Sequence, residues 1–155
     1  MTIAAYDYYR SPIGLIEIGC TDTGIASLFF VEETKQSPGE HWLLVESTAQ
    51  LAAYFAGHCH CFDLPLDLHG TDFQRRVWEQ LLAVPFGQTA TYLDIALALE
   101  NPQAVRAVDA ANGQNPVSIV VPCHRIIGSN GKLIGYGGGL WRKEWLLRHE
   151  GALLI

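Results

Sequence analysis

The sequence predicts an α/β domain over residues 1–70, followed by a mainly α domain over residues 71–155. Apolar, strand-forming runs fill the first thirty positions, and amphipathic helix patterns with capping residues fill the second half. The charge balance also changes at the boundary between them. Two short helices joined by a tight turn, with an Asn-Gly turn further on, indicate a helix-turn-helix in a winged-helix arrangement.

In the first domain, a strand is expected around Ile13–Ile18 and a second at Ile25–Val31, with Asp22-Thr23-Gly24 as the turn between them. A helix from about Thr48 follows, because its apolar residues have helical spacing up to a glycine stop at Gly57.

Residues Phe62–Leu68 are expected to be extended, and His69-Gly70 is the preferred domain boundary. In the second domain, Thr71 caps a helix whose apolar residues recur every four positions. The segment Thr91-Tyr92-Leu93-Asp94 has the form of a capping box, and its helix should continue to about Leu99.

Asn101 and Pro102 are suited to the cap and the first turn of the next helix, expected over Pro102–Ala111. Asn130-Gly131 predicts a hairpin between two apolar pairs. The last helix should cover Leu140–Glu150 and end at a glycine.

Composition excludes several classes of protein. The chain has 155 residues, 49% of them hydrophobic and 17% charged, which is enough to bury a core and excludes a disordered chain. No apolar run approaches the length of a membrane helix, and the N-terminus has no secretory pattern. We therefore expect a cytoplasmic protein with reduced cysteines.

The net charge of −6 would ordinarily argue against a nucleic-acid partner. Residues 1–70, however, hold nine acidic and two basic residues, whereas residues 71–155 hold seven acidic and eight basic ones. A nucleic-acid surface on the second domain is therefore possible.

The most informative segment is Pro122-Cys123-His124-Arg125. A thiol near an imidazole can act as a thiolate nucleophile, and Glu150 could orient the histidine. In an extended strand, neighbouring side chains would point to opposite faces, and only a turn would bring Cys123 and His124 together. On chemistry alone, a buried inert thiol beside a surface histidine is the favoured interpretation, and a reactive Cys123 is the alternative.

Several blocks together closely resemble the O(6)-alkylguanine-DNA alkyltransferases, also called methylated-DNA–protein-cysteine methyltransferases. The resemblance covers about residues 71–151, with a looser match before them. The blocks are Asn115–Ile127, Tyr136–Leu140, Lys143–Gly151, Thr71–Gln74 with Val77-Trp78, Tyr92, and Arg106–Val108. It implies a first domain with a small ribonuclease-H-like sheet and helix, and a second domain of winged-helix type.

The resemblance implies direct-reversal DNA repair. An alkyl group, usually methyl, would move irreversibly from the 6-oxygen of guanine, or the 4-oxygen of thymine, to Cys123. Each molecule would act once. The target base would be flipped out of a double-stranded DNA bound through its minor groove. We expect no cofactor and no metal. We also expect no association with a membrane and no obligate protein partner, so the protein should be a monomer.

The resemblance also assigns roles at the site. His124 would take the thiol proton through a water molecule, and Glu150 would hold His124 in the required tautomer. Asn115 would brace the turn that links the recognition helix to the active-site strand. Tyr92 would open the path of the flipped base and donate a hydrogen bond to the leaving guanine.

On the recognition helix, Arg106 would fill the gap left in the base stack, and small side chains would allow close approach to the minor groove. The residues assigned to this surface are Arg106, Ala104, Ala107, Ala110 and Tyr92. The substrate pocket would be formed by Tyr136, Gly137, Gly138, Val121 and Trp78.

Asp109 departs from the family, where glycine is expected after the Arg-Ala-Val segment. A carboxylate there would repel DNA phosphates and could pair with Arg106 three residues earlier. We expect that Asp109→Gly would tighten binding to duplex DNA.

The cluster His58-Cys59-His60-Cys61 contains metal-binding side chains, but alternate residues of an extended segment face opposite ways. We expect a solvent-facing loop rather than a metal site. Two other functions stay open: a cysteine hydrolase that uses Cys123, His124 and Glu150, and a DNA-damage binder that does not react. A transcriptional regulator is disfavoured, because neither a dimerisation element nor a strongly basic helix is evident.

Overall fold

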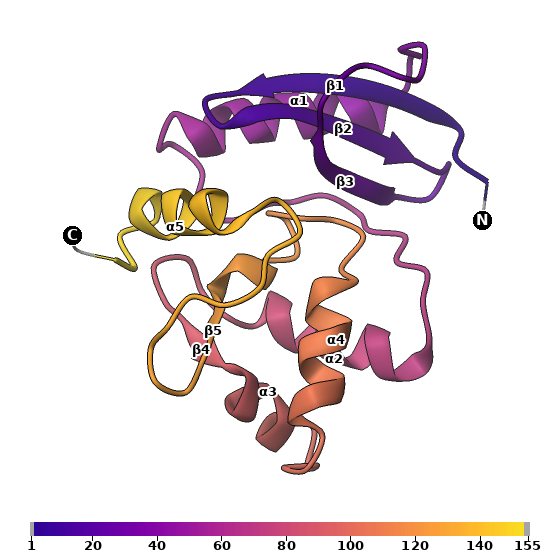
Figure 1. Cartoon of the computed structure of the whole chain (residues 1–155). Helices are drawn as coiled ribbons and strands as arrows, with labels where there is room; N and C mark the ends of the chain where they lie inside the picture. The colour runs from indigo at the N-terminus through magenta and orange to yellow at the C-terminus, as the bar shows by residue number, and fades with distance from the viewer. Residues whose placement is uncertain (1, 154–155) are drawn as a thin grey trace. The chain divides into compact units, whose positions relative to one another are not determined.

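The computed structural model describes residues 2–153, and the chain divides into two compact units, Met1–His69 and Gly70–Ile155 (Figure 1). The first unit contains a three-stranded antiparallel sheet in the order β1-β2-β3. Its strands are β1 (Ala5–Ser11), β2 (Gly14–Cys20) and β3 (Ile25–Val31). The predicted strand at residues 25–31 is confirmed. Strand β1 was not predicted from the sequence.

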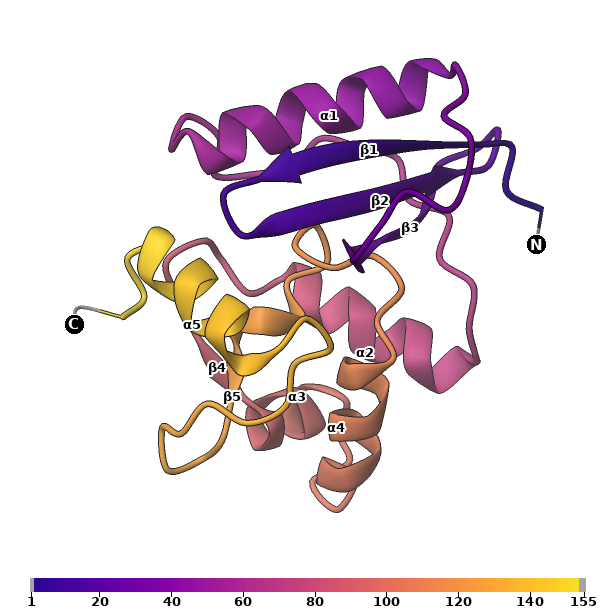
Figure 2. The same ribbon diagram turned by 45° about the horizontal axis from the view of Figure 1, so that its top comes forward.

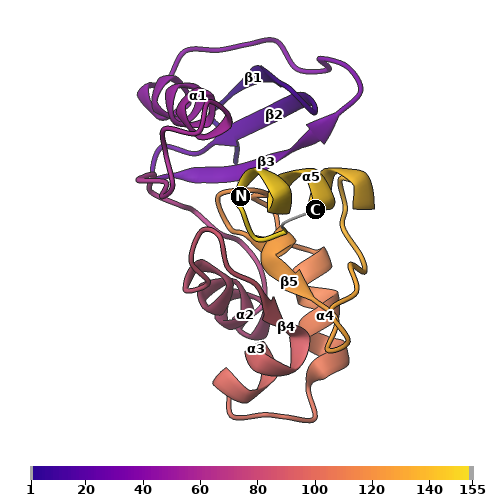
Figure 3. The same ribbon diagram turned by 90° about the vertical axis from the view of Figure 1, so that its left-hand side faces the viewer.

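Helix α1 (Trp42–Phe55) lies along one face of this sheet and packs on β1 and β2 (Figures 2 and 3). The sequence placed its start near Thr48, which is wrong. The helix begins six residues earlier, because the ring of His41 accepts a hydrogen bond from the Leu43 N–H at 3.2 Å and so caps it. Leu43 and Leu44 are buried in the first turn, which extends the apolar face.

The predicted turn between β2 and β3 is confirmed, because the Thr21 N–H donates to the Gly24 carbonyl at 2.9 Å. The Asp67 carboxylate accepts hydrogen bonds from the hydroxyls of Thr21 and Thr23 at 2.5 and 3.0 Å. An isolated parallel bridge joins Ile25 to Leu66. The extended segment before the domain boundary is thus held against the end of the sheet.

The second unit is helical. Its helices are α2 (Asp72–Leu82), α3 (Tyr92–Ala98), α4 (Val105–Gly113) and α5 (Leu140–His149), with a single 3₁₀ turn, η1 (Cys123–Arg125). Two short strands, β4 (Ala90–Thr91) and β5 (Ile126–Ile127), pair in parallel. Helix α4 packs against both α2 and α3, and α5 and α2 pack against η1.

Two predicted helix starts are confirmed, each by a complete capping box. The Thr71 hydroxyl accepts from the Gln74 N–H at 3.1 Å, and the Gln74 side chain returns a bond to the Thr71 N–H at 2.9 Å. Thr91 and Asp94 form the same reciprocal pair, at 3.0 and 2.8 Å, at the start of α3. These caps are local, so a four-residue pattern is enough to predict them.

The predicted start of α4 is wrong. Asn101 does not cap it, because the Asn101 N–H ends α3 by donating to the Ala96 carbonyl at 3.0 Å. The preceding Glu100 has a φ of 59°, the left-handed conformation that terminates a helix. Helix α4 then begins at Val105 and has no side-chain cap.

The predicted hairpin is also wrong. The turn at Asn130-Gly131 forms, with the Gly128 N–H donating to the Lys132 carbonyl at 2.9 Å, but no strand follows it in the described chain. Ile126–Ile127 pairs with β4 instead, and the Ile134 carbonyl accepts hydrogen bonds from side chains. Residues 128–139 therefore form a loop, here called the pocket loop.

Within the described residues, no helix combines the length and the apolar character that crossing a membrane requires.

Candidate active site

Cys123 lies in a turn, the second of the two local geometries that the sequence left open. Cys123–Arg125 form one 3₁₀ turn after Pro122, and the Cys123 N–H donates to the Val121 carbonyl at 2.8 Å. The Ile126 N–H closes the turn by donating to the Cys123 carbonyl. The backbone therefore does not follow the alternation of a strand, which had placed neighbouring side chains on opposite faces.

The structure brings His124 and Glu150 together. Glu150 caps the C-terminal end of α5, and its Oε2 lies 2.8 Å from His124 Nε2. Both side chains are completely buried. His124 Nδ1 is buried and has no hydrogen-bond partner among the described residues, so it is the ring nitrogen left for proton transfer.

Arg125 also holds Glu150, a role that the sequence did not assign. Its Nε donates to Glu150 Oε1 at 2.8 Å and a terminal nitrogen donates to Oε2 at 3.1 Å. The other terminal nitrogen donates to the Val84 carbonyl at 2.7 Å. The carboxylate is therefore fixed beside the histidine by a bidentate pair.

Burial determines the resting charge of the two reacting groups. It raises the pKa of the Cys123 thiol, although a hydrogen bond from Asn115 and the charge of Lys143 partly offset this. Burial lowers the pKa of His124, and Glu150 opposes that shift. The site at rest therefore contains a thiol and a neutral imidazole, side chains that can act as a nucleophile and a base.

Two asparagines contact the main chain around the nucleophile. Asn115 donates to the Val121 carbonyl at 2.7 Å and accepts from the Val117 N–H at 3.0 Å, so it braces the turn before Pro122. Asn112, which the sequence did not single out, donates to the Cys123 carbonyl at 3.4 Å.

Tyr92 begins α3, and its hydroxyl donates to the Ile134 carbonyl of the pocket loop at 3.0 Å. Burial, followed by the charges of Asp109 and Cys123, raises the pKa of Tyr92 to about 12. The phenol thus stays protonated and can donate a hydrogen bond. It lies within electrostatic reach of the nucleophile.

Lys143 is a second residue that sequence reasoning missed. Its side chain is fully buried, and its ammonium donates to the carbonyls of Ile126, Ile134 and Gly135 at 2.5, 2.9 and 3.2 Å. Burial lowers its pKa to about 8. The available signal was its spacing, since Lys143 lies three and four positions before the buried Leu146 and Leu147 on α5.

The residues expected in the substrate pocket have different environments. The Tyr136 hydroxyl is buried, which raises its pKa well above the usual value. At Gly137 an added Cβ would meet no protein atom within 4 Å, and the Gly138 carbonyl accepts from Arg142 at 2.9 Å. Trp78 lies in the core, where its indole N–H donates to the Ala111 carbonyl at 2.9 Å.

Helix α4 exposes the face on which DNA contacts were expected. Arg106, Ala107 and Ala110 are exposed and Ala104 is half-buried, whereas Ala111 is buried. Asp109 is exposed as well. Arg106 and Asp109 form no ion pair with each other, so the pairing that the sequence allowed is absent.

The four cysteines are free thiols, and within residues 2–153 no group of three or more metal-binding side chains converges. In the segment His58–Cys61, the Cys59 thiol donates to the Cys61 carbonyl at 2.9 Å.

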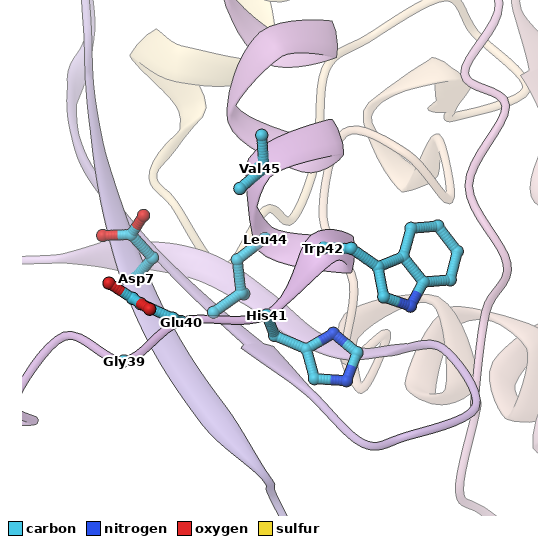
Figure 4. A pocket seen from close by; sticks show the side chains of 7 residues that line it. All are labelled: Asp7, Gly39, Glu40, His41, Trp42, Leu44 and Val45. Carbon is cyan, nitrogen blue, oxygen red and sulfur yellow. The ribbon is translucent and has the colours of Figure 1, made fainter.

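The first unit has a hollow of about 510 Å³ beside the start of α1, lined by Asp7, Glu40, His41 and Trp42 among others (Figure 4). His41 is the cap of α1 and lies 3.4 Å from Asp22, so its position has a structural explanation.

Family models match both units. The model described as "6-O-methylguanine DNA methyltransferase, DNA binding domain" matches residues 72–152, and its ribonuclease-like domain matches residues 4–68. Together they cover nearly the whole chain.

Individual proteins give the same result. The chain is 47% identical, over 96% of both chains, to a "Methylated-DNA--protein-cysteine methyltransferase" of Mycolicibacterium paratuberculosis. It is 45% identical to the protein of that name from Methanosarcina barkeri, over 94% of this chain and 96% of that one. A Mycobacterium tuberculosis OGT structure in complex with DNA matches with a TM-score of 0.87 and 45% identity, over 95% and 92% of the two chains.

Proposed function

The chain belongs to the 6-O-methylguanine DNA methyltransferase family, and from this premise we propose that Cys123 is the acceptor in a direct-reversal DNA repair reaction. An alkyl group moves from the 6-oxygen of guanine in duplex DNA to the Cys123 sulfur. The thioether formed is stable, so each molecule reacts once. The same transfer from the 4-oxygen of thymine belongs to the proposal.

The reaction begins with proton transfer. His124 Nδ1 takes the thiol proton through a bridging water, while Nε2–H donates to Glu150 at 2.8 Å. The negative carboxylate stabilises the imidazolium that forms, and Arg125 holds that carboxylate in place. The thiolate is thus generated in a site where burial otherwise keeps the sulfur protonated.

The thiolate then attacks the alkyl carbon in line with the bond to the guanine oxygen. The new S–C bond takes the sulfur lone pair, and the electrons of the broken C–O bond stay on the guanine. Tyr92, which keeps its proton to about pH 12, turns its hydroxyl from the Ile134 carbonyl to the guanine ring and donates a hydrogen bond there as this charge develops. The leaving base finally acquires a proton, so the net exchange is alkyl for hydrogen.

DNA is proposed to bind through the exposed face of α4. The small side chains of Ala107 and Ala110 permit close approach to a minor groove, and Arg106 is exposed so that it can enter the stack where the damaged base leaves. The pocket loop would form the wall of the base pocket, because Gly137 leaves space that no protein atom occupies.

The observation that carries the proposal is the burial of Cys123, His124 and Glu150 in one site, with His124 Nδ1 unpartnered among residues 2–153. A cysteine hydrolase could use the same residues, but it would turn over. A damage binder that does not react would leave the thiol unchanged. We extend the proposal to a cytoplasmic monomer, because the site uses residues of one chain and the substrate is cellular DNA.

Intact-mass spectrometry after mixing the protein with a duplex that contains one O6-methylguanine tests the proposal. We expect one added methyl group, located on Cys123, with no more than one equivalent repaired and no addition to Cys123→Ser. A bound but unmodified protein would favour a damage binder, and repair of many equivalents would favour a hydrolase.

A further inference from the structure

Asn112 is an unusual residue for its place in α4. The helix turns Val108, Ala111 and Asn112 inward, with spacings of three and four residues, and an apolar side chain would be usual at the third position. Asn112 is only 5% exposed. A buried amide of this kind needs hydrogen-bond partners for both its nitrogen and its oxygen.

The amide has only one partner. Asn112 Nδ2 donates to the Cys123 carbonyl at 3.4 Å, whereas its Oδ1 is buried and unpartnered among residues 2–153. Turning the amide over would not help, because two acceptor oxygens would then face each other. A buried unpaired acceptor lowers stability, so folding stability does not explain why an asparagine is here.

The neighbouring Asn115 suggests what the amide does. Asn115 lies just after the same helix, and its Nδ2 holds the Val121 carbonyl at 2.7 Å. The two amides therefore hold the carbonyls on either side of Pro122, which itself has no N–H to offer. Both connect the C-terminal end of α4 to the main chain of the nucleophile.

We propose that Asn112 is a positioning residue that transmits the seating of α4 on DNA to the backbone of Cys123. The inference rests on the proposed function, because it takes α4 as the DNA-binding helix. When α4 is drawn into the groove, a shift of its last turn moves the Cys123 carbonyl through the Asn112 amide. A correctly bound duplex therefore brings the sulfur fully into its attacking position, whereas a free base reacts without this shift.

The test measures the reaction rates of wild type and of Asn112→Leu with two substrates. Leucine is similar in size to asparagine but has no amide. One substrate is a duplex containing O6-methylguanine and the other is the free base O6-benzylguanine, which does not engage α4. With saturating duplex, we expect the single-turnover rate to fall at least tenfold, with the duplex Kd unchanged. The rate with the free base should stay within twofold of wild type, and the melting temperature should not decrease.

Gln114→Leu is the matched control. This amide is two residues further on, is exposed and pairs with Gln74 instead of the nucleophile segment, so both rates should be unchanged. Asn112→Ala serves if the leucine side chain prevents folding.

Equal losses on both substrates, a change only in duplex Kd, or no loss at all would each overturn the inference. Failure of the proposed function itself would show separately, since wild-type protein would then not be methylated.

Discussion

At the nucleophile, burial and charge act in opposite directions. Cys123 is 5% exposed, and burial favours its protonated form, while Lys143 and Asn115 favour the thiolate. His124 is completely buried, and its neutral form is favoured in the same way. In the proposed reaction, the thiolate therefore forms when His124 accepts the proton, and the Glu150 carboxylate stabilises the imidazolium that results.

Replacing Glu150 by glutamine preserves its size but removes that charge. We expect methyl transfer to slow by about 10²–10⁴-fold, because His124 loses the group that stabilises its imidazolium form. Single-turnover assays with O6-methylguanine duplex measure the rate. The control is Glu144→Gln, which breaks only an exposed ion pair with Arg148 and should keep the wild-type rate. A Glu150→Gln protein as fast as wild type would contradict the mechanism.

The lowered pKa of His124 makes stability depend on pH. The pKa of a histidine in the unfolded chain is about 6.5. Below this pH the unfolded chain therefore binds a proton at this position, whereas the buried His124 of the folded chain stays neutral until a lower pH. The free energy of unfolding should therefore decrease as the pH falls below about 6.5. Urea unfolding at a series of pH values measures this slope, which His124→Gln should reduce. Identical slopes for the two proteins would show that His124 is not the group responsible.

At the scale of elements, the pocket loop depends on a helix that follows it in the chain. Lys143 on α5 binds carbonyls of β5 and of the pocket loop, and Tyr92 on α3 binds the Ile134 carbonyl that Lys143 also contacts. One carbonyl thus joins α3, α5 and the loop. This arrangement replaces the hairpin ladder that the Asn-Gly turn predicted.

Lys143→Met should show how much of the loop's order comes from the ammonium group. Three main-chain carbonyls lose a donor, and we expect the free energy of unfolding to fall by about 1–3 kcal/mol. Amide hydrogen exchange should also become faster in residues 128–139. Lys132→Met, at an exposed lysine of the same loop, is the control and should change stability by less than about 0.5 kcal/mol. An unchanged exchange rate in Lys143→Met would refute this role.

Asp109 places a negative charge on the exposed face of α4, near Tyr92 and Lys143. We expect Asp109→Asn to bind duplex DNA about threefold more tightly at low salt, and the gain should shrink as salt screens the repulsion. Fluorescence anisotropy at several salt concentrations measures this, while the rate with free O6-benzylguanine should not change. Glu79→Gln, at an exposed acid of α2, is the control. Equal affinities of Asp109→Asn and wild type would show that Asp109 does not face the phosphates.

At the scale of the whole molecule, the proposed reaction leaves a protein with one more methyl group than the chain that folded. In the proposed reaction, the methyl group is added to a Cys123 sulfur that the fold has almost completely enclosed. Close-packed sites accommodate an added carbon only by shifting their neighbours. Cys123 lies in η1, against which both α2 and α5 pack, so the strain would spread through the second unit.

We therefore expect methylation of Cys123 to reduce the free energy of unfolding by about 1–3 kcal/mol. Thermal unfolding of protein that has reacted with O6-methylguanine duplex should show a lower melting temperature than protein incubated with undamaged duplex. The same melting temperature in both samples would mean that the site has room for the methyl group.

The features that depend on a few neighbouring residues could be predicted from the sequence alone. The capping boxes at Thr71 and Thr91, the turn before β3 and the glycine stop after α5 are of this kind, because both partners of each hydrogen bond lie within four residues. The Pro122–Arg125 block and the other blocks that resemble the family likewise indicated it from the sequence, because the resemblance depends on residue types at matching positions.

Only the tertiary structure decided the features whose partners lie far apart in the chain. The hairpin and the cap of α4 were mispredicted because their backbone groups bond to β4, Lys143 or the end of α3 instead. The contact of Asn112 with the Cys123 carbonyl is also of this kind. The pairing of His124 with Glu150, 26 positions away, was expected only from the family resemblance, and the structure supplies its geometry. Local preference is weak when a buried donor from a distant segment competes for the same carbonyl, and such a donor cannot be read from neighbouring residues.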